Sequence, residues 1–352
     1  MADHAVSQDR LLSAARRTLL PHPFPPRLDV EVAGSVPSSD GASTFFYDHL
    51  WPRPGRLALI TARVAGNTLE SALRAAGLRH LLRAALVTVE DPLHAIGLCR
   101  ESSGQPPFDA AVAILDTATG DLTSATEGIA VAGPVGAGLR GAGGLRGDHL
   151  TAGSLFWLAA GVATLPAEAP VNDSPQHLIQ NAGTALGNAA IAVISYKLPT
   201  RLSQHETISL SNDLADIPRV IVAFEQFCAR QGIAESTVQG VNVALDEILT
   251  NVVSYAFEDS TAHEIYVELK ANGQRLVVDV KDDGRPFDPL QAPAPELAGG
   301  IDDRIVGGLG IHFVRSILDD VSYRRVGGWN ILTLEKTTAA EPQPDQQRPS
   351  SS

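Results

Sequence analysis

The chain contains few cysteines and has a deficit of positive charge. Of its 352 residues only Cys99 and Cys228 are cysteines, which excludes a disulfide framework and suits a reducing cytoplasm. Lysine and arginine total 27 against 40 acidic residues, so the formal net charge is -13. This balance argues against a nucleic-acid partner and favours proteins or small molecules.

Segments that would carry the chain to or through a membrane are also missing. The start, Met1 to His4, has no basic residues followed by an apolar core, so we expect no signal peptide. The longest apolar run, near Leu155 to Leu165, is too short to span a bilayer. Hydrophobic residues still make up 44% of the chain, enough for sizeable cores. We expect a cytoplasmic protein of two domains with no membrane partner.

The most informative stretch, residues 244–257, is predicted to form an amphipathic helix. Its apolar stripe follows three- and four-residue steps and contains Val241, Leu245, Ile248 and Val252. Glu247, Asn251 and Ser254 follow the same spacing on another face. An asparagine oxygen suits Mg²⁺ beside nucleotide phosphates, and a glutamate one turn away could take a proton from a nucleophile. Taken alone, the pattern is more typical of a surface helix with a solvated polar face.

Two later segments complete an ordered set of motifs. Residues 280–289, VKDDGRPFDP, follow a predicted strand, and residues 307–315, GGLGIHFVR, open a predicted helix. The order E-x-x-x-N, D-x-G-x-x-F and G-x-G resembles the GHKL ATPase superfamily, and most closely its anti-sigma-factor serine kinases. The resemblance covers residues 205–338. It implies an ATP-binding α/β sandwich with a mixed sheet.

The resemblance also implies a role for each matching residue. Asn251 would ligate Mg²⁺, and Glu247 would be the catalytic base for a substrate serine. Asp282 would accept a hydrogen bond from the adenine amino group, and Gly284 would let the base approach the backbone. The alternative for Asp282 is a turn residue in Asp-Asp-Gly, where Asp283 is an adjacent choice of register.

The phosphates of ATP would lie at a glycine-rich helix start. Gly308 and Gly310 would present backbone N–H groups there, although both could simply begin the helix. Residues 289–306 are rich in proline, alanine and glycine and resemble the lid of the family. Arg304 in this lid could contact the γ-phosphate or be solvated.

The implied function is a serine protein kinase of a partner-switching cascade. Its substrate would be a STAS-type anti-sigma antagonist, and a sigma factor would be a second partner. The alternative is an ATP-gated binding module, or a pseudoenzyme scaffold, without kinase turnover. Glu247 favours the kinase, because a pure binding module needs no base. The related kinases are commonly homodimers, although no residue pattern here fixes the oligomeric state.

The first half of the chain has the pattern of a sheet-rich α+β domain. A helix is predicted over residues 7–20 and another over 69–85, with a hairpin between 110–116 and 122–125. Further strands are predicted at residues 28–33, 44–49, 57–64, 154–158 and 189–197. Many strands with few helices favour the α+β class.

This half also resembles a second family, the SpoIIE-type (PPM) metal-dependent serine phosphatases. The resemblance rests on residues 17–21 (RTLLP), 46–48 (FYD), 64–66 (VAG) and the hairpin at Ala110. The resemblance implies a β-sandwich with helices. In that family aspartates hold two divalent ions that activate a water molecule. Here the aspartate motifs are replaced by Phe45, Arg63, Ala159–Gly161 and Gly187–Asn188, and Asn67 stands in place of a histidine.

These replacements predict a phosphatase-like domain without phosphatase activity. Asp48 survives, but one carboxylate is a poor site for two dications, and Arg63 would repel them. We therefore expect a pseudophosphatase that scaffolds or regulates its neighbour. The expected domains are an N-terminal helix and proline-rich connector at 1–25, the pseudophosphatase at 26–198, the ATP-binding domain at 199–338 and a disordered tail at 339–352.

Overall fold

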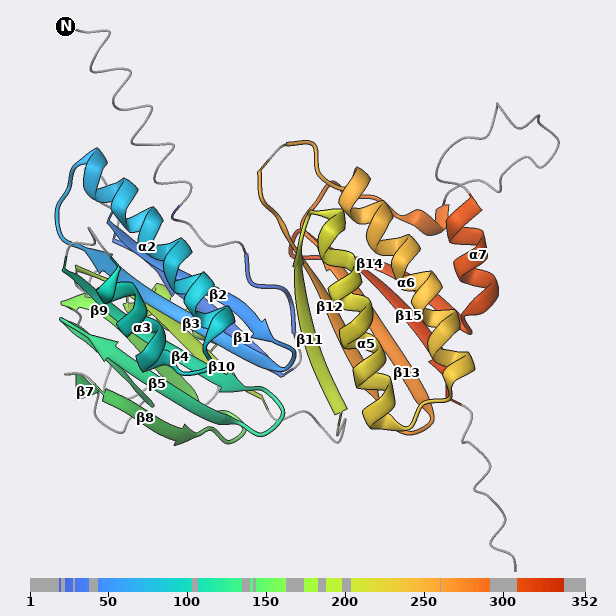
Figure 1. The fold of residues 1–352 in the computed structure, drawn as a ribbon, viewed down its shortest axis with the longest axis horizontal. Helices are drawn as coiled ribbons and strands as arrows, with labels where there is room; N and C mark the ends of the chain where they lie inside the picture. The colour runs from blue at the N-terminus through green and yellow to red at the C-terminus, as the bar shows by residue number, and fades with distance from the viewer. Residues whose placement is uncertain are drawn as a thin grey trace, which may run out of the picture. The chain divides into compact units, whose positions relative to one another are not determined.

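The chain divides into two compact units, Met1–Arg201 and Leu202–Ser352 (Figure 1). The computed structural model describes residues 19, 23–27, 29–37, 44–102, 107–134, 140–141, 144–162, 174–182, 188–197, 204–259, 261–291 and 309–338. Across these ranges no helix has both the length and the apolar character needed to cross a membrane. Apart from Leu19, the helix expected over residues 7–20 lies outside them, as does the tail at 339–352.

The first unit is a sandwich of two five-stranded sheets with the orders β2-β3-β4-β5-β8 and β1-β10-β9-β6-β7. All its strand pairs are antiparallel. The strands are β1 (Val30–Ser35), β2 (Phe45–Arg53), β3 (Arg56–Val64), β4 (Phe108–Asp116), β5 (Asp121–Glu127), β6 (Ala130–Pro134), β7 (Arg140–Gly141), β8 (Gly144–His149), β9 (Leu155–Val162) and β10 (Asn188–Tyr196). The sheets meet where β3 and β4 pack on β9.

Helices cover the outer faces of this sandwich. α2 (Leu69–Thr88) and α3 (Pro92–Glu101) pack on the first sheet (Figure 1). α4 (Pro175–Ala182) packs on β1 and β10 of the second. α2 begins at Thr68 because the Thr68 and Ser71 side chains cap each other's backbone N–H groups. The α+β class and the predicted hairpin are confirmed, whereas α3, α4 and the strands β6, β7 and β8 were not foreseen.

The second unit is one five-stranded sheet with helices on one face (Figure 1). Its strands are β11 (Gln204–Ser211), β12 (Glu264–Ala271), β13 (Arg275–Asp282), β14 (Asp320–Val326) and β15 (Trp329–Thr337). Its helices are α5 (Ile217–Gln231), α6 (Glu235–Tyr255) and α7 (Leu309–Ile317), with short 3-10 turns at Leu214–Asp216 and Pro289–Gln291. The helices predicted from residues 244–257 and 307–315 correspond to α6 and α7.

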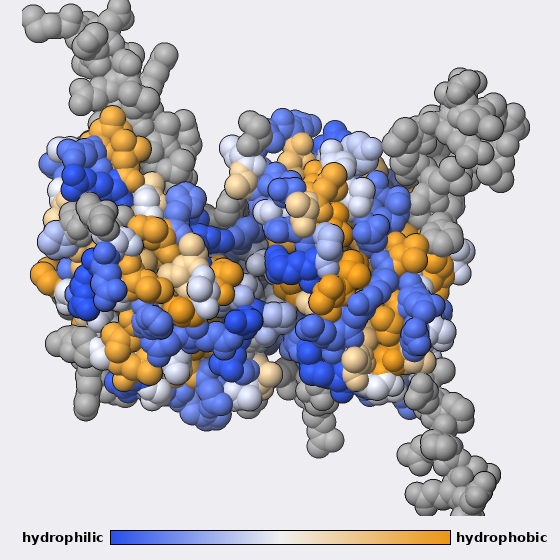
Figure 2. Space-filling model, in the orientation of Figure 1, coloured by the Kyte–Doolittle hydropathy of each residue, from blue (hydrophilic) through white to orange (hydrophobic). Residues whose placement is uncertain are grey.

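Amphipathic patterning places the core of this unit between the helices and the sheet. The stripe predicted for α6 packs there, with Val241, Leu245 and Ile248 buried among Phe224 and Phe227 of α5. Both hairpins turn at glycines with positive φ, Gly273 at 82° and Gly327 at 58°. The outward side of the helices is polar, and Figure 2 shows hydrophilic surface between small apolar areas on this face.

The mixed sheet expected for this unit is wrong for its described strands. The sheet order is β11-β12-β13-β15-β14, and each neighbouring pair is antiparallel. β13 and β14 do run in the same direction, as strands joined through one crossover helix should. They are not neighbours, because β15 turns back from β14 and lies between them.

Candidate functional site

The carboxylate and carboxamide predicted to share one face of α6 do lie together. Asn251 Nδ2 donates a hydrogen bond of 2.9 Å to Glu247 Oε1 across one helical turn. Both side chains are half-buried, and Ser254 on the next turn is exposed. Within the described part of the chain no protein donor reaches Asn251 Oδ1. This carbonyl oxygen is therefore the atom that can ligate a hard cation.

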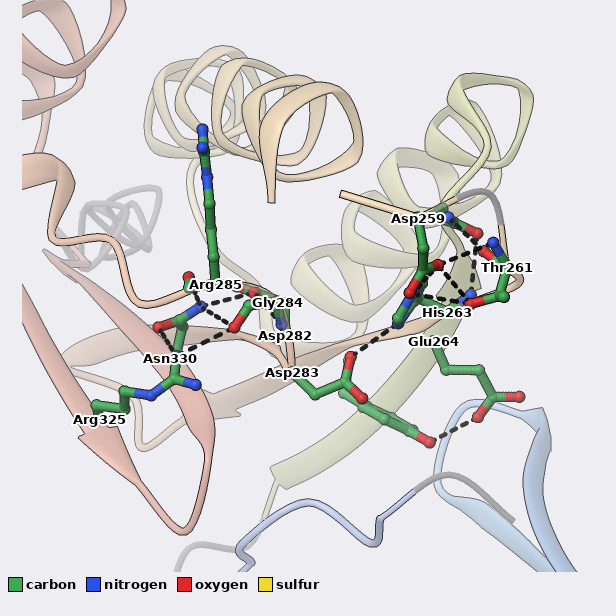
Figure 3. Close-up of polar contacts among 12 residues, drawn as sticks. Asp259, Thr261, His263, Glu264, Asp282, Asp283, Gly284, Arg285, Arg325 and Asn330 are labelled. Atoms are coloured by element: carbon green, nitrogen blue, oxygen red, sulfur yellow. Dashed lines mark hydrogen bonds and ion pairs between the residues drawn. The ribbon is translucent and has the colours of Figure 1, made fainter. Parts of the chain in front are cut away.

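The D-x-G segment begins where β13 ends. Asp282 is only 5% exposed, and its Oδ1 accepts hydrogen bonds from Gly284 N at 3.0 Å and from Asn330 Nδ2 at 2.8 Å (Figure 3). Burial raises the pKa of the Asp282 carboxyl, and these two hydrogen bonds partly offset that rise. Among the described residues no protein donor reaches Oδ2, which is left to accept a bond from a ligand.

Close packing brings this segment to the C-terminal end of α6. A Cβ on Gly284 would lie 2.5 Å from Ala256 O and 2.8 Å from Ala256 Cβ, so only glycine fits. Arg285 N donates to Ala256 O at 2.9 Å. Asn251 is five residues earlier on the same helix, about 7.5 Å along its axis. The structure thus brings Glu247, Asn251, Asp282 and Gly284 to one end of the unit.

The third motif lies at the start of α7. α7 runs beside α6 in the opposite direction (Figure 1), and a Cβ on Gly240 of α6 would lie 2.9 Å from Ile317 Cγ2. The start of α7, with Gly310 in its first turn, therefore lies alongside the half of α6 that carries Asn251. Gly308 lies outside the described residues. So do residues 292–306 of the expected lid, which include Arg304, whereas Pro289–Gln291 form a 3-10 turn.

Sequence reasoning missed several residues that surround Asp282. Asn330 pairs with Asp282 in the register of β13 and β15, and it also donates to Arg285 O at 2.9 Å. His263 lies between two carboxylates, with Nδ1 3.2 Å from Asp283 Oδ1 and Nε2 3.0 Å from Asp259 Oδ1 (Figure 3). One available signal was Asn330 itself, a polar residue next to the apolar run of a buried strand.

In the first unit Asp48 forms ion pairs with two arginines of α2. Arg79 Nε and Nη2 donate to its Oδ2 and Oδ1 at 2.7 and 3.1 Å, and Arg83 Nη1 lies 3.0 Å from each oxygen. Burial would raise the pKa of this carboxyl, but Arg83 and Arg79 outweigh burial and hold the pKa at about 2. The guanidinium groups of Arg79 and Arg83 thus surround the surviving carboxylate. Arg63 Nη1 instead lies 3.4 Å from Asp109 Oδ2.

Comparison with known proteins matches the second unit to an ATPase domain family and to serine kinases. The histidine kinase-like ATPase domain family matches residues 210–336. The serine/threonine-protein kinase BtrW of Bordetella bronchiseptica is 30% identical over 139 residues, which are 40% of this chain and 98% of that protein. The serine-protein kinase RsbW of Listeria innocua is 32% identical over 98 residues, which are 26% of this chain and 62% of that protein.

Two solved structures are similar to larger parts of the chain. The RsbU and RsbW domains of Rv1364c from Mycobacterium tuberculosis cover 89% of this chain and 94% of that chain, with a TM-score of 0.41 and 17% identity. The SiaA-PP2C domain of Pseudomonas aeruginosa covers 56% of this chain and 98% of that chain, with a TM-score of 0.41 and 16% identity.

The fold and the three motifs define the second unit as a histidine kinase-like ATPase domain. Through this domain the chain belongs to the family of serine/threonine-protein kinases that includes BtrW. The resemblance of residues 205–338 to the anti-sigma-factor serine kinases is therefore confirmed.

Proposed function

We propose that the second unit is an ATP-dependent serine kinase that phosphorylates a STAS-type antagonist in a partner-switching cascade of the cytoplasm. A sigma factor is the second partner in this proposal, and a homodimer is the expected assembly. The observation that carries the proposal is the Glu247–Asn251 pair on α6 beside the Asp282–Gly284 segment. A base next to a cation ligand is needed for transfer and is superfluous for simple nucleotide binding.

The side chains present suit ATP and Mg²⁺. Asn251 Oδ1 is an oxygen ligand that adds no negative charge beside phosphates, and its hydrogen bond to Glu247 fixes which amide atom is offered. Asp282 Oδ2 is a buried acceptor of the kind that matches an adenine amino group. Gly310 in the first turn of α7 keeps side-chain bulk away from a helix start that suits phosphates.

Each residue then has a distinct part in the reaction. Bound ATP would supply the phosphoryl group, and Mg²⁺ would neutralise charge on its phosphates. Glu247 would accept the proton of the substrate serine hydroxyl as the serine oxygen bonds to phosphorus. Asn251 would hold the cation, and Asp282 with Gly284 would hold the adenine ring. Most of the rate would come from this positioning and from charge neutralisation.

Replacing Asn251 by alanine should weaken the Mg²⁺-dependent part of ATP binding. Calorimetry of the full chain with and without Mg²⁺ is expected to show a loss of affinity of about tenfold to a hundredfold in Mg²⁺, the order of the loss when a residue that supports a metal ligand is removed. Asn242→Ala is the matched control, because Asn242 is on the same helix and instead donates to Glu225. Its ATP affinity should equal that of the wild type.

Transfer of the γ-phosphate to candidate STAS proteins, measured alongside, separates the proposed kinase from the alternatives. Transfer to a serine supports the kinase. Mg²⁺-dependent ATP binding without transfer to any candidate would replace it with an ATP-gated binding module. A chain that binds no ATP would be a pseudoenzyme scaffold.

We also propose that the first unit has lost phosphatase chemistry and serves its neighbour as a scaffold or regulator. The guanidinium groups around Asp48 support this, because they already balance the charge that metal ions would balance. With Mn²⁺ or Mg²⁺ the full chain should release no phosphate from p-nitrophenyl phosphate or from a serine-phosphorylated STAS protein above the rate of an Asp48→Asn variant. Metal-dependent release that the variant lacks would contradict this prediction.

A further inference from the structure

The carboxamide of Asn330 uses its full hydrogen-bonding capacity. Nδ2 donates to Asp282 Oδ1 at 2.8 Å and to Arg285 O at 2.9 Å. Oδ1 accepts from Arg325 Nη1 at 2.6 Å and from Tyr323 OH at 2.8 Å. An amide has two N–H donors and two lone pairs, so all four are in use. The neighbours of the amide are donors on one side and acceptors on the other, so only one orientation of the amide satisfies all four bonds.

Arg325 connects this amide to the D-x-G segment. Besides Asn330 Oδ1, its Nη1 lies 3.2 Å from Gly284 O (Figure 3). Arg325 is an exposed residue of β14. It therefore anchors the Asp282–Gly284 segment to the β14–β15 hairpin without being part of the hydrophobic core.

The orientation of Asn330 decides what Asp282 presents to a ligand. With Nδ2 directed at Asp282, Oδ1 of the carboxylate is occupied and Oδ2 is left to accept a bond from a ligand. Without the Asn330 Nδ2 donor, Oδ1 would lose a hydrogen bond that stabilises the carboxylate, and the protonated carboxyl would be favoured. An Asp282 protonated on Oδ2 could donate to a carbonyl instead of accepting from an amino group, while Oδ1 keeps its bond from Gly284 N.

We propose that Arg325 is a positioning residue that, through Asn330, makes the nucleotide site select a purine with an amino group at C6 over one with a carbonyl at C6. Adenine carries an amino group and guanine a carbonyl oxygen at the corresponding edge of the purine ring. The inference rests on the proposed binding of ATP beside Asp282. It extends that proposal to base selectivity and to a residue outside the three motifs.

Arg325 also influences the charge state of Asp282. Burial raises its pKa most, and the neighbouring Asp283 raises it further. Asn330, Gly284 and Arg325 lower it, and His263 faces Asp283. Loss of Arg325 therefore favours the protonated carboxyl. The ratio of GTP to ATP dissociation constants should fall as the pH falls, and it should begin to fall at a higher pH without Arg325.

The test measures the dissociation constants of Mg-ATP and Mg-GTP for the full chain between pH 5.5 and 8. The variants are Arg325→Gln, Arg325→Lys and Arg324→Gln. For Arg325→Gln the GTP-to-ATP ratio should fall about tenfold at pH 7, the value of one hydrogen bond to a charged group. For Arg325→Lys the GTP-to-ATP ratio should lie between those of Arg325→Gln and the wild type. Arg324→Gln is the matched control, because Arg324 instead donates to Thr333 on the same sheet.

Asp282→Asn makes the result decisive, since an asparagine can donate to a guanine carbonyl. If wild type binds no ATP, the proposed function itself fails. If Asp282→Asn changes the ratio and Arg325→Gln does not, the ATP site stands and the inference about Arg325 is overturned. An equal loss of affinity for both nucleotides in Arg325→Gln, with an unchanged ratio and pH profile, would reduce Arg325 to a general structural role.

Discussion

Glu247→Gln is expected to slow phosphoryl transfer to a STAS substrate by about 10²- to 10⁴-fold, the range of a lost general base. Glutamine keeps the length of the side chain and an oxygen that can accept from Asn251 Nδ2. The cation ligand therefore keeps its orientation, and the affinity for Mg-ATP should stay within about twofold of the wild type. Single-turnover transfer of labelled phosphate, with ATP binding measured separately, distinguishes the two effects.

Asp246→Asn is the matched control for this prediction. Asp246 directly precedes Glu247 on α6 but is exposed on another side of the helix, so the variant removes one negative charge away from the site. Its transfer rate should equal that of the wild type. If Glu247→Gln transfers phosphate at the wild-type rate, Glu247 is not the base. If both variants lose transfer equally, the cause is the general charge of α6.

Features of the site that depend on short spacing in the sequence were predictable. Glu247 and Asn251 are four residues apart, so helical periodicity alone places them together, as the structure confirms. Their roles, with those of Asp282, Gly284, Gly308 and Gly310, stay predictions. The contact between Gly284 and Ala256 could not be read from either segment, because it depends on how the loop after β13 packs against the end of α6.

Residues that reach the site through sheet register were not predictable in the same way. Asn330 lies opposite Asp282 only because β15 inserts between β13 and β14, the same feature that makes the expected mixed sheet wrong. Strand order depends on which whole strands pair with one another. The alternation of polar and apolar residues within one strand does not reveal it. Arg325 follows from that register, since it lies opposite Asn330 in the β14–β15 hairpin.

The arginine partners of Asp48 in the first unit were not predictable either. The sequence marks Asp48 as the surviving acidic residue but does not reveal what balances its charge. Arg79 and Arg83 are four residues apart and share a face of α2, which is a local pattern. That this face meets β2 is a tertiary fact, set by the apolar residues Leu78 and Leu82 that pack α2 onto the sheet.

The four contacts between Asp48 and these arginines predict that Asp48→Ala will lower the free energy of unfolding of the first unit by about 3–5 kcal/mol, as loss of one member of a buried ion pair does. Asp48 is 1% exposed, and Arg79 is buried with it. Urea unfolding should be followed by tryptophan fluorescence in a Trp329→Phe background. The remaining tryptophans, Trp51 and Trp157, are both in the first unit and buried, so the signal reports that unit.

Glu70→Ala is the control, because Glu70 forms an exposed ion pair with Arg74 on the same helix and should change stability by less than about 0.5 kcal/mol. Acid gives an independent readout. The pKa of Asp48 is about 2 in the folded chain, against an ordinary value of 3.8. Its stabilisation is therefore complete above pH 3.8 and is lost as the pH falls towards 2, which amounts to roughly 2 kcal/mol. Asp48→Ala should remove this part of the acid dependence. A variant as stable as the wild type, with an unchanged acid profile, would mean that the arginines do not stabilise the fold through Asp48.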